Sequence, residues 1–196
     1  DAVAALRRYG LVKATEDALT MHRLLQQVVR DRLDPSTASR RVGLVVRLLA
    51  AVFPREGYRD PRTWPTSGRL LAHVLAVADQ AQQRAAELGD TAMLLDRAGG
   101  YLLGRARYRE ARALYERALA LTEATFGPDH IRTGFRLHNL GFCLMRQHEV
   151  PALARQYLER SLDIEQATLG PEHPSVAIAL AHLGQVMRQL GELGGA

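Results

Sequence analysis

The chain has 196 residues, of which 47% are hydrophobic and 24% charged, and its formal net charge is +5 at pH 7. This composition is typical of a protein with a buried core, and no apolar run approaches the ~20 residues that cross a bilayer, so no membrane association is expected. The single cysteine, Cys143, excludes an internal disulfide and a multi-cysteine metal site, and it favours a cytoplasmic location. The basic residues are nearly all arginines interleaved with Glu or Asp, which favours solvated helix faces over a nucleic-acid-binding surface.

The N-terminal 34 residues predict a helix, a hairpin and a second helix. The stretch "AVAALRRYGLV" (2–12) predicts a short helix that ends near Gly10. "LVKATEDALTMH" (11–22) predicts two apolar strands around a polar turn, and "MHRLLQQVVRDRL" (21–33) is helical again. This order is typical of the end of a winged-helix fold.

More specifically, residues 1–34 resemble the winged-helix segment that closes the nucleotide module of NB-ARC or STAND signalling ATPases. That family has a Met-His-Asp motif here, whose histidine reaches the phosphate of bound ADP. Met21 and His22 match this motif, whereas Arg23 replaces the aspartate. The resemblance implies that His22 senses nucleotide; the alternative is that His22 begins the helix and hydrogen-bonds to the wing.

A complete nucleotide site is not predicted in this chain. A Walker A loop needs glycine-rich backbone followed by Lys and Ser or Thr, but Lys13 is the only lysine and lacks that glycine spacing. No cofactor is therefore expected here, and any ADP or ATP would be bound elsewhere in a longer parent protein.

The next segment, residues 35–90, predicts two helices, at 36–53 and 69–88, joined by a loop rich in Pro, Gly and charge at 54–68. We expect an adaptor or a degenerate repeat hairpin. Trp64 is expected to anchor the loop onto the helix pair, and a ligand-binding role for this tryptophan is the alternative.

The segment 91–196 contains an internal repeat. "TFGPDH" (125–130) recurs as "TLGPEH" (168–173), 43 residues later, and the flanking sequences align at the same offset. The apolar residues recur at helical spacing, so each period predicts two helices. The Gly-Pro-acid-His joint is expected to link one hairpin to the next, with Asp129 capping the following helix. Small residues are expected where paired helices approach closely: Gly99, Ala111, Gly141, Ala154 and Gly184.

These features resemble tetratricopeptide repeats of the roughly 42-residue variety found in kinesin light chains. The resemblance covers residues 91–196 and implies about two and a half repeats. The expected fold is therefore mainly α, a right-handed α–α superhelix with a partial winged-helix segment at the N-terminus. Its concave face would hold a peptide or another protein segment.

The resemblance also indicates which side chains face the groove, if Gly141 is the close-packing position. Asparagine and arginine at such positions bind a peptide backbone and carboxylates, and Phe and Met accept apolar side chains. The alternative is that the same residues pack against a neighbouring domain of the same protein. The groove candidates are Asp96, Phe135, His138, Asn139, Phe142, Met145, Arg146, Gln185 and Arg188.

No pattern in the sequence predicts catalysis or metal binding. The histidines lack HExxH or similar metal spacing, and Cys143 is expected to be a core residue rather than a nucleophile. His130 and His173 recur with the joint, which capping and packing explain. We therefore expect neither an enzyme nor a metal site in this chain.

The interpretation we favour is the junction and first sensor repeats of a bacterial STAND-type regulatory protein. Two alternatives remain: a plain repeat scaffold, and a DNA-binding regulator that uses Arg23, Arg30 and Arg32. The chain begins without Met and ends at "GELGGA", where a helix pair would be half complete, so we expect it to be part of a longer protein. Self-association is then expected through the open face of the last helix (about 174–190), with these residues exposed: Leu180, Leu183 and Val186.

Overall fold

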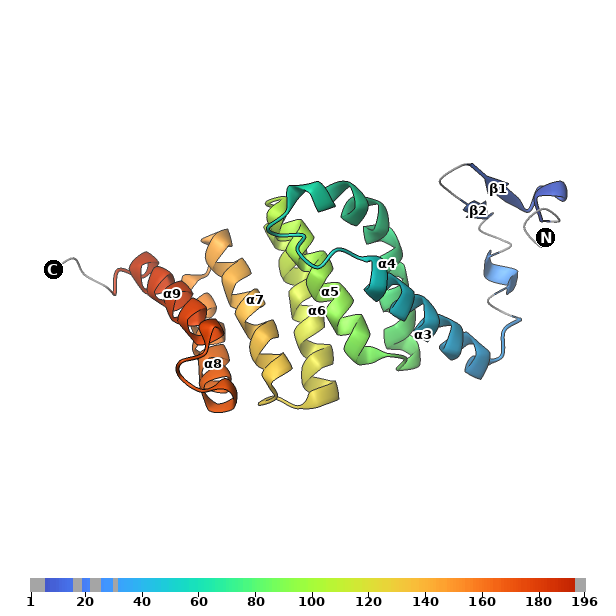
Figure 1. Ribbon diagram of the computed structural model, residues 1–196. Helices are drawn as coiled ribbons and strands as arrows, with labels where there is room; N and C mark the ends of the chain where they lie inside the picture. Colours follow the sequence, from blue (N-terminus) through green and yellow to red (C-terminus); the bar gives the residue numbers. More distant parts are fainter. Residues whose placement is uncertain (1–5, 16–18, 22–25, 30–31, 193–196) are drawn as a thin grey trace. The chain divides into compact units, whose positions relative to one another are not determined.

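The chain forms two compact units, Asp1–Arg41 and Val42–Ala196, in a computed structural model. His22 and Arg23 of the predicted nucleotide-sensing motif lie outside the described residues. None of the described helices combines the length and apolar character that spanning a membrane requires. The described residues are 6–15, 19–21, 26–29 and 32–192 (Figure 1).

The first unit contains the predicted hairpin. Strands β1 (Val12–Ala14) and β2 (Leu19–Met21) pair antiparallel, with Val12 opposite Met21. The short helix before β1 ends at Arg8, and the turn that follows contains Gly10 with a φ of +66°. The hairpin is confirmed, whereas the winged-helix assignment stays a prediction.

The predicted pair of helices is present, with shifted bounds. α3 (Pro35–Val52) leads through a loop and the short η1 (Pro61–Thr63) into α4 (Trp64–Arg84). α4 begins five residues before the predicted start because Pro65, which the sequence suggested as part of the loop, is well tolerated in a first helical turn. It ends earlier because Ala85 takes a left-handed conformation with φ 50°.

The repeat region folds into successive helical hairpins. α5 pairs with α6 and α7 pairs with α8, and α9 then packs on α8 (Figure 1). This order confirms the predicted repeat, because each Gly-Pro joint links one hairpin to the next helix. The bounds of these helices are Leu88–Gly104 (α5), Tyr108–Phe126 (α6), Ile131–Gln147 (α7), Pro151–Leu169 (α8) and Pro174–Gln189 (α9).

The two joints share one capping device. Gly127 and Gly170 follow α6 and α8 with φ of 97° and 86°. The histidine of each joint then caps the next helix: Nδ1 of His130 accepts from the amide of Arg132 at 3.1 Å, and His173 is the equivalent N-cap of α9. The expected capping role of Asp129 is therefore wrong, since the helix begins one residue later and the histidine occupies the cap position.

The recurrent glycines differ in how closely they are approached. A Cβ on Gly141 would lie 2.7 Å from Cγ of Leu158, and one on Gly99 would lie 2.9 Å from the ring of Tyr115. These two confirm the predicted close packing. A Cβ on Gly184 would meet only the tip of Arg188, at 3.9 Å, because none of the described residues packs on that side of α9.

The outer face of α9 is open only in part. Leu180 is 48% exposed, as predicted, and Leu183 is half-buried. Val186 is fully buried, so its predicted exposure is wrong; it belongs to the core that α9 shares with the preceding hairpin. Self-association through this face stays a prediction.

Candidate peptide-binding groove

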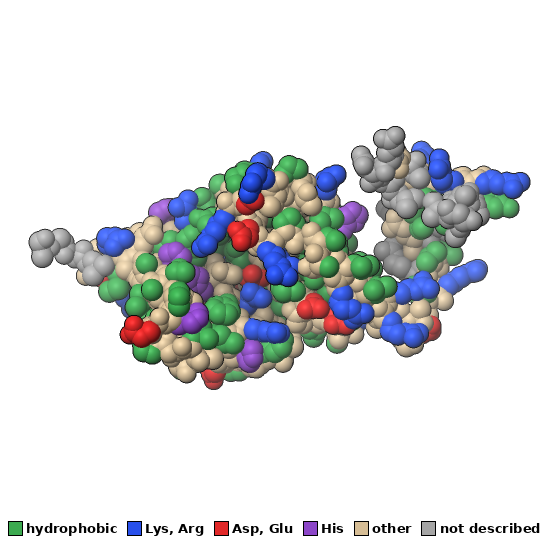
Figure 2. All heavy atoms as spheres, viewed as in Figure 1, with side chains coloured by type: hydrophobic (Ala, Val, Ile, Leu, Met, Phe, Trp, Pro, Cys, Tyr) green, Lys and Arg blue, Asp and Glu red, His purple; other side chains and the backbone are tan. Residues whose placement is uncertain are grey.

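Helices α5, α7 and α9 lie side by side as the first helices of successive repeats, and a cavity of about 620 Å³ opens along them. Figure 2 shows this face, with histidine side chains gathered on the α7–α9 side and charged side chains toward α5. The cavity is lined by Arg55, Glu56, Tyr58, Arg59, Asp96, Arg97, Gly100, Leu103, Tyr115, His138, Asn139, Phe142, Met145, Arg146, Ile178, His182 and Gln185.

The helical repeat explains why these residues share one surface. Three or four positions separate His138 from Phe142 and Phe142 from Met145, so α7 presents them on one face. On α9, Ile178 and His182 follow the same spacing. Successive first helices therefore place their cavity-facing rows next to each other.

The loop after α3 forms part of the groove wall. Tyr58 reaches across to α7, where its ring meets that of Phe142 edge to face, with centroids 5.4 Å apart. The loop lies against α5 so closely that a Cβ on Gly57 would sit 3.1 Å from the backbone of Tyr101. A segment of the chain itself thus lies in the groove, with an aromatic side chain against α7.

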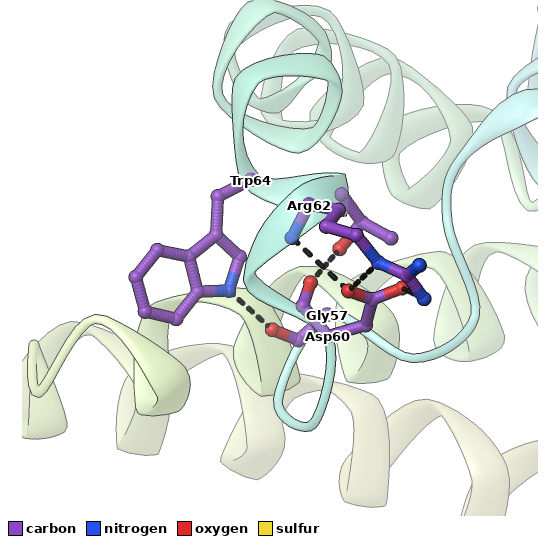
Figure 3. A network of polar contacts seen from close by, with 5 residues as sticks. Gly57, Asp60, Arg62 and Trp64 are labelled. Carbon is purple, nitrogen blue, oxygen red and sulfur yellow. Dashed lines mark hydrogen bonds and ion pairs between the residues drawn. The ribbon is translucent and has the colours of Figure 1, made fainter.

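Trp64 holds this loop in place, which confirms its predicted anchoring role. Its indole Nε1 donates to the carbonyl of Gly57 at 2.7 Å (Figure 3). Beside it, the Asp60 carboxylate accepts from the amide and the guanidinium of Arg62, which lowers the pKa of Asp60. The guanidinium of Arg105 lies over the Trp64 ring, 5.1 Å from its centroid.

Two helices share a polar network at the centre of the groove. The amide of Asn139 on α7 donates to Asp96 on α5 at 2.9 Å, and Arg136 pairs with the same carboxylate at 3.0 Å. Because Arg136 and Asp96 are both largely buried, this pair neutralises Asp96 and fixes the amide of Asn139.

The remaining charge in the groove is mostly positive. Arg55, Arg59 and Arg146 line the cavity, where Glu56 is the acidic residue apart from the neutralised Asp96. Arg97 also lines it but serves the fold, since its Nη1 donates to the carbonyl of Ala50 at 2.7 Å and so ties α3 to α5. The arrangement suits a ligand that carries carboxylates.

A buried carboxylate and two histidines form a series of neighbouring side chains across three helices. Glu165 on α8 is fully buried; its Oε1 accepts from the hydroxyl of Ser161 at 2.8 Å and lies 3.7 Å from Nδ1 of His138. Nε2 of His138 lies 3.1 Å from Nδ1 of His182, whose ring stacks on Phe142 with centroids 4.5 Å apart. This series of side chains thus runs from the core to the cavity wall.

Glu165 and His182, at the two ends of this series, have shifted pKa values. Burial alone would raise the pKa of Glu165, but contacts with His138, Ser161 and Ser175 outweigh it and hold that pKa below its usual value. Burial, followed by the charges of His138 and Arg59, lowers the pKa of His182 from 6.5 to about 4. At neutral pH, Glu165 is therefore ionised and His182 is neutral.

The comparisons with known proteins agree with this architecture. A family model of the tetratricopeptide repeat matches residues 90–149 and 135–196, which together make up more than half of the chain. The chain belongs to the tetratricopeptide-repeat family. No curated protein shows a significant sequence match.

Among solved structures, BtubC (BKLC) from P. vanneervenii is similar to this tetratricopeptide-repeat chain, with a TM-score of 0.51 and 19% identity over 80% of this chain. The match spans 65% of the length of BtubC. A kinesin light chain with nearly identical TPR-like repeats from Podosopora anserina gives a TM-score of 0.47 and 18% identity over 85% of both chains. The family model and the match to BtubC confirm the mainly α, helical-repeat fold.

The tetratricopeptide repeats bring most of the predicted groove candidates together. Two of the candidates lie outside the cavity: Phe135 in the first turn of α7 and Arg188 in the last turn of α9, both exposed. His182 also lines the cavity, although it was not among the predicted groove candidates. The candidates that line the cavity are Asp96, His138, Asn139, Phe142, Met145, Arg146 and Gln185.

Cys143 lies behind the groove wall. It is fully buried, and burial raises the pKa of its thiol to about 12, so it is protonated and unreactive in the folded protein. Within the described ranges, no three His, Cys, Asp or Glu side chains lie together as a metal site.

Proposed function

We propose that the groove along α5, α7 and α9 binds an extended segment of another protein, or of a neighbouring domain of the same protein. The observation that carries this proposal is the loop at Tyr58, which already lies in the groove with its ring against Phe142. The groove therefore accepts a turn of polypeptide together with an aromatic side chain.

The lining residues indicate how such a segment would be held. Arg146 and Arg59 offer cations to carboxylates, and Gln185 offers an amide to the peptide backbone. Met145 and Phe142 supply apolar contact area. Since tetratricopeptide repeats are typically non-catalytic, we infer a binding function rather than an enzymatic one, in the cytoplasm.

Selection from a displayed library of random peptides tests this proposal. We expect wild type to enrich peptides that combine acidic and apolar residues, and the Arg146→Glu variant to lose them by at least about tenfold in affinity, which corresponds to about 1.4 kcal/mol. Arg188→Glu is the matched control, because Arg188 is an exposed arginine outside the cavity. Equal loss in both variants, or no enrichment by wild type, would refute the groove as the site.

We further propose that the repeats regulate a STAND-type signalling ATPase, with segments 1–34, 35–90 and 91–196 as winged-helix end, adaptor and sensor repeats. The antiparallel β1/β2 hairpin supports the winged-helix part. In this arrangement, His22 senses bound ADP or ATP, and ligand binding in the groove shifts the nucleotide module between two states.

The nucleotide content of the longer protein that would contain this segment tests the regulatory role. We expect ADP to be released on denaturation of the wild type and to be reduced in His22→Ala. A longer protein that carries no nucleotide would leave a repeat scaffold without a switch.

A further inference from the structure

The series Glu165–His138–His182 links a buried charge to the surface that a ligand would contact. An ionised carboxylate accepts hydrogen bonds but cannot donate them. Glu165 faces Nδ1 of His138, which favours a proton on that nitrogen. The state of His138 then decides what its other nitrogen, Nε2, does toward His182.

When His138 is neutral with its proton on Nδ1, Nε2 is an acceptor. The 3.1 Å contact with His182 then requires a proton on Nδ1 of His182. The remaining nitrogen of His182, Nε2, then carries a lone pair, so this cavity-lining side chain offers a hydrogen-bond acceptor.

When His138 is protonated, both of its nitrogens donate. Its Nε2 now donates to Nδ1 of His182, and a neutral His182 must carry its proton on Nε2. The groove therefore donates a hydrogen bond where it accepted one before. A single proton on His138 thus inverts the polarity of His182 while His182 keeps the same charge.

We propose that the series Glu165–His138–His182 sets whether the groove donates or accepts a hydrogen bond at His182. The groove then takes up one proton when a carboxylate of an acidic protein segment binds there. The proposal rests on the proposed binding function and adds to it the chemistry of the ligand and a dependence on pH. The positive groove, with Arg55, Arg59 and Arg146 against Glu56, favours an acidic segment in either state.

Other charged and titratable groups surround the two histidines. Of the residue types present, histidine is the one whose ordinary titration falls between pH 5 and 8. The neighbouring groups are Asp96 and Arg97 on α5, Tyr115 on α6, Arg136 and Arg146 on α7, Glu165 on α8, and Arg55, Glu56, Tyr58 and Arg59 in the loop.

The tautomers of the histidines can be measured without a ligand, by two-bond ¹H–¹⁵N correlation spectra of the full chain. We expect the proton of His182 to move from Nδ1 to Nε2 between pH 8 and about pH 5. Glu165→Gln should give a mixture of tautomers at pH 8, because the carboxylate no longer selects one. Glu172→Gln, at an exposed site, is the matched control and should behave as wild type. An unchanged His182 tautomer across this range overturns the proposal.

Binding of a fluorescein-labelled peptide, one leucine flanked by two glutamates on each side, tests the ligand. We expect its affinity for wild type to rise as the pH falls, by up to about tenfold per pH unit, which is the limit for uptake of one proton. His138→Gln should abolish this dependence because an amide does not titrate. His73→Gln, an exposed histidine on α4, should keep it.

The outcomes separate this inference from the function on which it rests. If the peptide binds equally at both ends of the pH range, the proton linkage is overturned while groove binding stands. If it binds at neither end, and library selection also fails, the binding function is refuted together with the acidic ligand. Binding that strengthens at low pH in wild type but not in His138→Gln supports both.

Discussion

α7 and α9 are the same element in successive repeats, yet their surroundings differ. Leu137 and Leu180 lie 43 residues apart at equivalent positions; Leu137 is fully buried, whereas Leu180 is 48% exposed. The equivalent glycines differ in the same way. A Cβ on Gly141 would overlap the side chain of Leu158, whereas one on Gly184 would contact only the guanidinium of Arg188.

The difference shows which properties belong to the repeat sequence and which to its neighbours. Both helices begin at a histidine cap and both present side chains to the cavity, so the inner face depends on the helix itself. Burial of the other face depends on the second helix of the hairpin. α8 supplies that helix for α7, and none of the described residues supplies it for α9.

The largest expected effect is on the leucine pair. Leu137→Ala should lower the free energy of unfolding by about 2–5 kcal/mol, because it leaves a cavity in a packed core. Leu180→Ala should lower it by less than about 1 kcal/mol, because this side chain is half exposed. Urea unfolding followed by circular dichroism measures both, and equal losses would contradict the comparison.

The glycine pair should give effects of opposite sign. Gly141→Ala should destabilise the protein by about 1–3 kcal/mol, since its Cβ would overlap Leu158. Gly184→Ala has room, so the better helix propensity of alanine should stabilise α9 by up to about 1 kcal/mol. The midpoints of thermal unfolding test the signs; destabilisation by both substitutions would show that α9 is packed as tightly as α7.

A smaller, pH-dependent effect distinguishes His182 from Asn139, its equivalent in α7. Burial lowers the pKa of His182 to about 4 in the folded protein. The unfolded protein therefore binds a proton at His182 below about pH 6.5, whereas the folded protein binds it only near pH 4. The contribution of His182 to stability is therefore present above pH 6.5 and is lost as the pH falls toward 4.

His182→Gln should consequently lose less stability than wild type between pH 7 and pH 4.5, measured by urea unfolding at each pH. His73→Gln, at an exposed site, should follow wild type. Parallel curves for wild type and His182→Gln would show that the imidazole is not held neutral in the fold.

The repeat was the part of the molecule that its sequence predicted best. Apolar residues at helical spacing predicted the helices and their buried faces, and the recurring Gly-Pro joint marked where one hairpin ends, so the hairpins and most inward-facing residues followed. His182 was missed because adjacent helical positions differ by about 100° in direction, so an error of one residue in the register of α9 takes a side chain out of the predicted groove. The loop at Tyr58 was missed because its place in the groove depends on contacts with Tyr101 and Phe142, which have no local signal.

The most direct test of the account is to map where an enriched peptide binds, from changes in the backbone amide spectrum of the full chain. We predict that the largest shifts fall on the inner residues of both α7 and α9, including Asn139 and Gln185, despite the difference in burial between these helices. Shifts confined to the outer helices α6 and α8, or to the open face of α9 at Leu180, would contradict the groove as the binding site.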